Sequence, residues 1–234
     1  LDAVSGYVVS GTVKKNSPPT APAIVCPVSG SSTYNNAPRF MLTTGVEPDG
    51  QSQIVEVKID TGAWFNSVDN PERFSTSGYL GNSAKTVYQA ETLANGSHTI
   101  ALRCLDSDIE SASPEVVRTF TVLPTPFETI TANVTHVKAT HIQALRTAVN
   151  MARGYYNLSP MIWSEEIAAG KTTIKNWPFH ITELRKAIEP VVTAINGFDY
   201  SPAFDITPVT WLPIGIGRPK ADVMQQIHNL ILIL

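Results

Sequence analysis

Histidine and arginine recur at matching positions in the C-terminal half of the chain. His141 and Arg146 lie in a stretch that reads H-I-x-x-L-R, and His180 and Arg185 lie in a second copy of it. Imidazole and guanidinium groups can hold a metal ion or an anion between repeated units. The His and Arg of one copy diverge on a helix, however, so the two do not share one site.

The spacing of the histidines favours a structural role. His136 and His141 lack the i, i+4 spacing that two ligands of one ion need on a helix. We therefore expect each histidine to hydrogen-bond backbone groups of the preceding segment, and each arginine to cap a neighbouring loop. A metal or anion site between repeats is the alternative, and the prediction is that no metal is bound.

Paired carboxylates are the next candidates for chemistry. Glu165 and Glu166 are adjacent and point apart, so they do not place an acid and a base around one bond. Asp106 and Asp108 could bind calcium, but they lack the regular ligand spacing of a calcium loop. Nucleophile elbows, phosphate-binding glycine loops and cysteine–histidine settings are absent from the sequence. The sequence therefore predicts no catalytic residue, no cofactor and no enzymatic activity.

Aromatic side chains offer a surface for stacking on sugar rings. Trp64, Phe65 and Tyr79 are the candidates in the N-terminal part, and a glycan-binding role would need their rings exposed in a row. Packing of the Trp64 ring in the core or against a turn is the alternative. In the C-terminal part we expect four further rings to cover helix ends: Trp163, Trp177, Phe204 and Trp211.

Cys26 and Cys104 are the only two cysteines. Two are too few for a disulfide-stapled scaffold, and their spacing suits no metal knuckle. Two buried thiols that pack as small hydrophobes, or one bridge between two strands, are both compatible with the sequence.

Short apolar runs separated by turn residues predict an all-β domain over residues 17–124. Residues 1–16 are expected to form a leading strand or linker, and Asn16 to Pro22 is too rich in proline for a helix or a central strand. The strands are predicted at 23–26, 39–42, 54–59, 63–65, 86–90, 97–105 and 116–122.

Three stretches of this domain resemble bacterial immunoglobulin-like modules. Gly96 to Asp106 is similar to their penultimate strand, Arg118 to Val122 to their closing strand, and Val57 to Trp64 to their central hairpin. The resemblance implies an immunoglobulin-like (fibronectin-like) β-sandwich.

Beyond Pro124-Thr125-Pro126 the apolar period changes from two to about 3.6, which predicts an all-α domain over 127–234. It should contain about three hook-plus-helix units, near 134–173, 174–215 and 216–234. A hook is an extended segment that connects two helices, and hooks are expected at 157–174 and 198–217. The apolar stripes of the three helices are Ile142, Leu145, Val149, Ala152 and Tyr156; then Ile181, Leu184, Ile188, Val192 and Ile195; then Val223, Ile227, Leu230, Ile231 and Leu234. We expect the stripes to form a small bundle; docking of the last one to a partner subunit is the alternative.

Helix ends are predicted from capping residues. Thr140 with Gln143 indicates a start for the first helix, and Asn176 one for the second. Asp222 with Gln225 indicates a start for the third. Gly197 should end the second helix, and Pro190 should bend it.

The H-I-x-x-L-R unit resembles a repeat of secreted bacterial proteins and prophage-encoded structural proteins. There it often follows immunoglobulin-like modules. In the third copy Val223 and His228 replace the His and the Arg, so those two residues are not needed in every unit.

A net charge of −3 gives no footprint for nucleic acid, and no apolar run is long enough to span a membrane. Because the chain begins at Leu1, we expect it to be a fragment of a longer protein. The two resemblances imply a non-enzymatic structural or adhesion module of an extracellular or phage virion (tail) protein. Its partners would be other domains of that protein or other virion or cell-surface proteins, with a cell-surface glycan as a further candidate. The alternative is a carbohydrate-binding accessory module of a secreted hydrolase.

Overall fold

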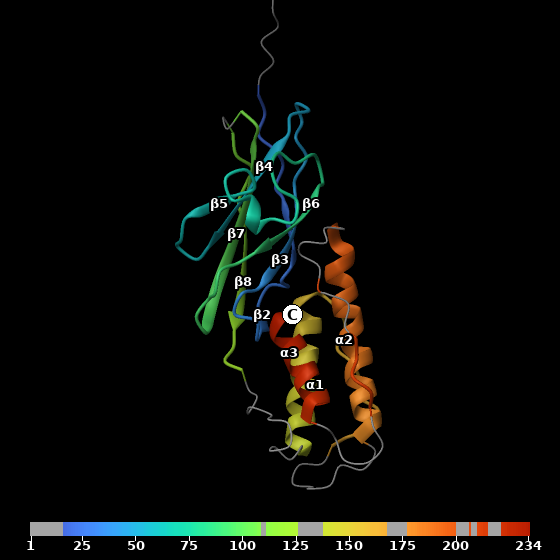
Figure 1. The fold of residues 1–234 in the computed structure, drawn as a ribbon. Coiled ribbons are helices and arrows are strands. Elements are labelled where there is room, and N and C mark those ends of the chain that lie inside the picture. The colour runs from blue at the N-terminus through green and yellow to red at the C-terminus, as the bar shows by residue number, and fades with distance from the viewer. Residues whose placement is uncertain are drawn as a thin grey trace, which may run out of the picture.

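The computed structural model describes residues 16–108, 111–125, 138–167, 177–199, 206, 210–214 and 221–234. In these residues the chain forms eight β-strands followed by three α-helices. Figure 1 shows an elongated molecule with the strands at one end and the helices at the other. The predicted leading segment at 1–15 lies outside the described residues.

The strands form two sheets. In the first, β1 (Ala23–Cys26), β3 (Arg39–Thr43) and β6 (Lys85–Gln89) pair in that order. In the second the order is β2 (Ser31–Thr33), β8 (Val116–Val122), β7 (Gly96–Asp106), β4 (Gln53–Ile59) and β5 (Trp64–Asn66). All pairs are antiparallel except β2 with β8. A short 3-10 helix, η1 (Pro71–Arg73), lies between β5 and β6.

Alternate residues of the strands form the core between the sheets. Phe40 of the first sheet and Phe120 of the second meet edge to face, with ring centroids 5.2 Å apart. The strands predicted from the sequence are present, and they lie in two sheets that contact each other through this ring pair. Sequence reasoning missed β2, because Ser31-Ser32-Thr33 has no apolar alternation and is held by its parallel partner Phe120–Val122.

The proline-rich stretch after Asn16 packs on the sandwich, although we interpreted it as a linker. The Thr20 amide donates to the Val46 carbonyl oxygen at 2.9 Å, and the Val46 amide donates to the Thr20 hydroxyl at 2.7 Å. A Cβ on Gly45 would lie 2.0 Å from the Thr20 carbonyl oxygen. Only glycine therefore lets the entering chain approach this closely.

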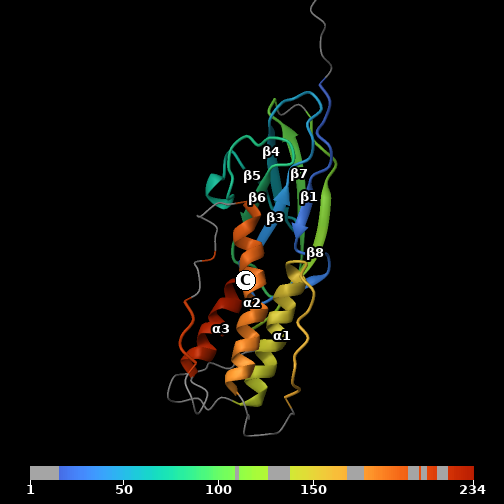
Figure 2. The same cartoon turned by 90° about the vertical axis from the view of Figure 1, so that its right-hand side faces the viewer.

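The helices are α1 (Ala139–Tyr155), α2 (Trp177–Asp199) and α3 (Ala221–Ile233). Their predicted stripes are buried, with one correction: Val191 is fully buried in α2 and Val192 only partly. Burial of the α3 stripe within the chain favours core packing over partner docking. Figure 2 shows α2 reaching past α1 and α3 alongside the first sheet, where Lys85 of β6 lies 5.2 Å from the Phe198 ring centroid.

Several predicted helix ends are wrong. The first helix begins at Ala139, one residue before Thr140, and the His141 Nδ1 accepts from the Lys138 amide at 3.0 Å. His141 therefore acts at the position assigned to Gln143. Gly197 does not end α2, which continues to Asp199 with Pro190 inside it. Trp177 is the first residue of α2 and not part of a hook, while Asn176 and Phe204 lie outside the described residues.

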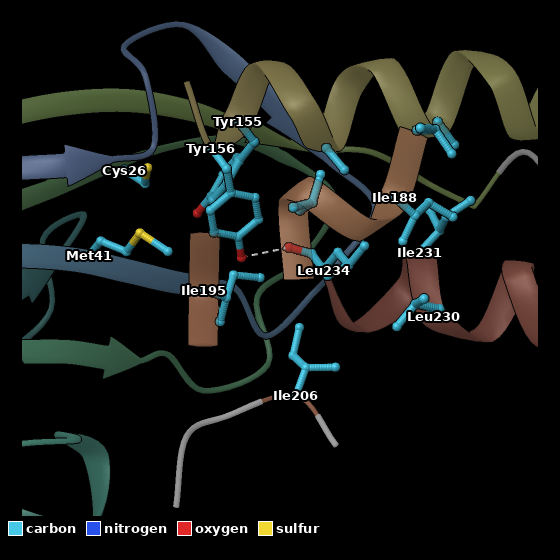
Figure 3. Close-up of a cluster of buried hydrophobic side chains, with 14 of the residues drawn as sticks. Cys26, Met41, Tyr155, Tyr156, Ile188, Ile195, Ile206, Leu230, Ile231 and Leu234 are labelled. Atoms are coloured by element: carbon cyan, nitrogen blue, oxygen red, sulfur yellow. Dashed lines mark hydrogen bonds between the residues drawn. The ribbon is translucent and has the colours of Figure 1, made fainter. Parts of the chain in front are cut away.

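The two ends of the molecule share one buried cluster. Tyr156, after α1, donates its hydroxyl to the Leu234 carbonyl oxygen at 2.8 Å, and Figure 3 shows Cys26 and Met41 of the sandwich beside this contact. Asn35 and Arg39 both donate to the Ile233 carbonyl oxygen at 3.2 Å. Buried apolar residues run without a break from the sandwich into the helices. The division into 17–124 and 127–234 stays a prediction.

Candidate functional site: the joints between helical units

The aromatic residues proposed for glycan stacking do not lie in one row. Trp64 lies on the sheet face turned away from the core, with the Lys58 ammonium 4.5 Å and the Arg103 guanidinium 4.3 Å from its ring centroid. Phe65 is the next residue on β5 and so points to the opposite face, toward Tyr88. Tyr79 is 57% exposed and lies on a separate segment before β6. Of the three rings, Trp64 has two cationic side chains against it.

The cysteines do not form a disulfide. Cys26 and Cys104 are both free and buried. Burial raises the pKa of the Cys26 thiol to about 12 and that of Cys104 to about 11, so both remain protonated at neutral pH. Of the two alternatives that the sequence left open, the structure has the buried thiols, which are not nucleophiles.

The candidate calcium ligands are bound to protein groups. The buried Asp106 accepts from the Asn16 side-chain amide at 2.9 Å and from the Ser111 hydroxyl. Asp108 accepts from Gln51 at 2.9 Å. Within the described parts of the chain, no group of three or more His, Cys, Asp or Glu residues is placed to hold a metal ion.

Arg146 meets the histidine of the next unit and not that of its own. Its Nη2 donates to the His180 Nδ1 at 3.0 Å and to the Glu183 carboxylate at 2.9 Å. Its Nη1 donates to the Glu165 carbonyl oxygen at 2.7 Å. The guanidinium also lies 4.7 Å from the Trp163 ring centroid. One side chain therefore ties α1 both to the following hook and to α2.

Glu183 completes this arrangement from α2. Its second oxygen accepts from the Ser164 amide at 2.9 Å. Burial raises the pKa of Glu183, but the bonds from Ser164 and the charge of Arg146 outweigh burial, so the pKa is held below its usual value. Burial lowers the pKa of Arg146, and Glu183 opposes that shift. We call Arg146, Trp163, Ser164, His180 and Glu183 the first joint.

A second joint has the same design between α2 and α3. The Arg185 guanidinium lies 4.8 Å from the Trp211 ring centroid and donates to the Leu212 carbonyl oxygen at 2.7 Å. The Leu212 amide donates to Gln226 of α3 at 3.0 Å. Thus Gln226 does for Leu212 what Glu183 does for Ser164. The second joint comprises Arg185, Trp211, Leu212 and Gln226.

Sequence reasoning missed the pairing of each arginine with a tryptophan. Trp163 and Trp211 each precede the residue whose amide bonds to the next helix, but they follow their arginines by 17 and 26 residues, and this difference hides the correspondence. We predicted that the rings cover helix ends, whereas they stack on Arg146 and Arg185 in mid-helix. The signal was an Arg in each repeat followed by one Trp in each hook.

Beside the first joint lies an open hollow of about 490 Å³. Gln143, Arg146, Thr147 and Asn150 of α1 form its base, and Trp163 and Glu165 lie at the hook side. Several of these polar groups already bind the hook: Gln143 donates to the Ile167 carbonyl oxygen, and Asn150 bonds both to the amide and to the carbonyl oxygen of Met161. Three of the polar side chains that line the hollow, Gln143, Arg146 and Asn150, are therefore already bonded to the hook.

No helix in the described residues has the length and apolar character to cross a membrane. No family model matches the chain, and no curated protein matches it.

Among solved structures, the PKD domain of an M14-like peptidase from Thermoplasmatales archaeon SCGC AB-540-F20 is 13% identical, with a TM-score of 0.35 over 47% of this chain and 99% of that one. CopC from Methylosinus trichosporium OB3b is 21% identical, with a TM-score of 0.27 over 44% of this chain and 91% of that one. The chitinase ChiW from Paenibacillus sp. str. FPU-7 is 14% identical, with a TM-score of 0.28 over 50% and 9%. With TM-scores this low, none of the three likenesses carries an argument about function.

Proposed function

We propose that the chain is a non-enzymatic structural module of a larger extracellular or virion protein, acting by display and contact. The observation that carries this proposal is the use of its reactive side chains. Arg146, His180, Glu183 and Arg185 are each at least 92% buried and bonded within the joints. They hold helices and hooks together, which is a structural use of these groups.

The junction with the sandwich supports a rigid module. Hydrogen bonds from Asn35, Arg39 and Tyr156 fix the end of α3, and the Val28 amide donates to the Tyr155 carbonyl oxygen at 3.2 Å. A continuous buried cluster adds apolar contact at the same place. Such a junction keeps the sandwich and the helices in one orientation, which is what a spacer needs in order to position a contact surface.

The finer assignment to a phage tail or prophage-encoded protein is supported by the resemblance of the H-I-x-x-L-R repeat alone. The partners in this proposal are neighbouring domains of the same protein, or other virion or cell-surface proteins.

Rigidity is tested by small-angle X-ray scattering of the chain and of the double variant Asn35→Ala, Arg39→Ala. We expect the wild-type chain to scatter as one elongated particle with a single, well-defined maximum dimension. The variant should show a broader distribution of interatomic distances. Glu72→Ala, an exposed change on η1, is the control. Independent tumbling of two bodies in the wild-type chain would contradict the proposal.

The absence of catalysis is tested with glycoside, peptide and ester substrates. We expect no turnover above that of heat-unfolded chain. Turnover that purifies with the folded chain, and is abolished by Glu165→Gln with Glu166→Gln, would replace the proposal with an enzyme.

A further inference from the structure

The two joints differ in the residues that can gain or lose a proton. Glu183 of the first joint corresponds to Gln226 of the second, because each accepts from the hook amide, of Ser164 or of Leu212. His180 corresponds in the repeat to Val223. The first joint thus carries an imidazole and a carboxylate where the second carries an alkyl group and an amide.

The contact between Arg146 and His180 fixes the protonation of the imidazole. A guanidinium nitrogen can only donate, so the His180 Nδ1, 3.0 Å from the Arg146 Nη2, must accept. An imidazolium has no acceptor nitrogen. The observed contact therefore requires neutral His180, and the ring is buried, with 3% of the residue exposed.

We propose that the first joint is a pH-operated link between α1 and α2, which protonation of His180 opens while the second joint stays closed. A proton on Nδ1 removes the acceptor for Arg146. It also leaves two cationic groups in contact in a buried site, where like charges repel strongly.

Two carboxylates lie within 4.0 Å of the His180 ring and would attract an imidazolium, so the link opens only if the repulsion from Arg146 and the loss of its bond outweigh that attraction. Glu183, on the same helix, is 4.0 Å from Nδ1 and is already bonded to Arg146 and Ser164. Glu165, on the hook, is 3.8 Å from Nε2, which is beyond hydrogen-bond distance, and its side chain is 53% exposed. Among the described residues, Arg146 of α1, Glu183 of α2 and Glu165 of the hook are charged groups that face the ring.

The consequence is local. When Arg146 turns away from His180, it also loses its alignment with Glu183, and the Ser164 amide then loses a fixed acceptor. The segment that carries Trp163 and Ser164 is released from α2. Leu212 and Gln226 contain no group that titrates near neutral pH, so the second joint is a control within the same molecule.

Amide hydrogen exchange of the full chain, followed by 15N NMR, tests the proposal. Protection factors are compared at pH 7 and pH 5, after correction for the intrinsic exchange rate. We expect the Ser164 amide to lose about tenfold or more of its protection, which is the size of one lost charge-assisted hydrogen bond. The Leu212 amide should stay within about twofold. Unchanged protection at Ser164, or an equal loss at both amides, overturns the proposal.

Exchanging the residues between the joints sharpens the test. His180→Val with Glu183→Gln gives the first joint the second joint's residues and should abolish the loss at Ser164. Val223→His with Gln226→Glu should transfer it to Leu212. In the unaltered chain, imidazole 15N shifts provide a readout that does not depend on a variant folding. They should show His180 neutral at pH 7 and charged over the interval in which Ser164 loses protection. If His180 stays neutral throughout that interval, the imidazole is not the trigger.

Discussion

The sandwich and the helical part satisfy their buried backbone groups in different ways. In the sandwich, paired strands bond backbone to backbone along continuous ladders such as β4 with β7. In the helical part, the described portions of the connecting segments have no strand partners, and side chains from the helices bind them instead. Asn150 binds Met161, Asn196 binds Ile206, and Arg146 and Arg185 bind hook carbonyl oxygens. The backbone groups of the helical part's connections therefore depend on a few specific side chains. Those of the sandwich strands depend on backbone pairing, which the alternation of buried and exposed residues sets.

The largest expected effect tests whether the two regions are separate at all. Leu102→Ala in β7 and Leu184→Ala in α2 each remove a fully buried side chain and should cost about 4 kcal/mol of unfolding free energy. Because the buried cluster is continuous, we expect both variants to shift one common urea transition, monitored by circular dichroism and tryptophan fluorescence. Two transitions, each moved by only one variant, would restore the division into independent domains.

The joints should differ in their sensitivity to loss of the arginine. Arg146→Met leaves the buried Glu183 carboxylate without its cation and should cost about 3 kcal/mol. Arg185→Met leaves only the neutral Leu212 carbonyl oxygen unpaired and should cost about 1 kcal/mol. Urea unfolding of both variants measures the difference. Equal costs would show that the Glu183 charge adds nothing to the first joint.

On the sandwich, Trp64→Ala should cost about 1 kcal/mol, because it removes the ring that lies against Lys58 and Arg103. We expect no change in binding to bacterial cell-wall polysaccharides on a glycan array. Glycan binding by the wild-type chain that disappears in the folded variant would favour the carbohydrate-binding alternative. Phe65→Ala, on the opposite face, is the matched control.

The smallest expected effect is a pH dependence of opposite sign at two groups, His98 in the sandwich and Glu183 in the helical part. Burial lowers the pKa of His98 in the sandwich, but its bonds to Asp60 and Ala94 outweigh burial and raise it above 6.5. Stability from this pair is therefore present below pH 6.5 and is lost as the pH rises through the folded pKa. The loss should be under about 1 kcal/mol for so exposed a pair. In Asp60→Asn the loss should disappear.

At Glu183 in the helical part, the contribution to unfolding free energy changes with pH in the opposite direction. Its pKa is lowered in the folded chain, so its contribution is present above about 4.5 and is lost as the pH falls through the folded pKa. Unfolding free energies measured from pH 4 to pH 9 check both signs, with Glu183→Gln as the acid-side control. A profile in which Glu183→Gln matches the wild-type chain at low pH would contradict this assignment.

The sequence predicted the parts of the fold that depend on periodicity. Period-two alternation located β4, β7 and β8, and period 3.6 located the stripes led by Ile142 and Ile181. Both patterns arise because one face of each element is buried. The apolar residues of that face recur at a regular spacing, which is visible in a single amino-acid sequence. The strand β2 escaped because its pairing with β8, and not its composition, makes it a strand.

The joints were less accessible to sequence reasoning for a physical reason. Arg146 and His180 lie in different repeats, so their contact depends on how α1 and α2 pack, and no spacing within one repeat shows it. The spacing indicates that His141 and Arg146 diverge on the helix. It contains no information about what each contacts across the interface with the next helix. Trp163 and Trp211 were recognised as packing residues but not as partners of the arginines.

The central strand of the first sheet, β3, lies between two attachment points through which a pulling force would be transmitted. Arg39, at its start, holds the end of α3, while Val46, just past its end, is strapped to Thr20 of the entering chain. Tension applied between residue 16 and the helices would therefore pass along β3 and load its ladders with β1 and β6 in shear. In shear, many hydrogen bonds have to break at once, whereas in a hairpin pulled apart from its ends they break one after another. The first sheet should therefore resist a larger force than such a hairpin.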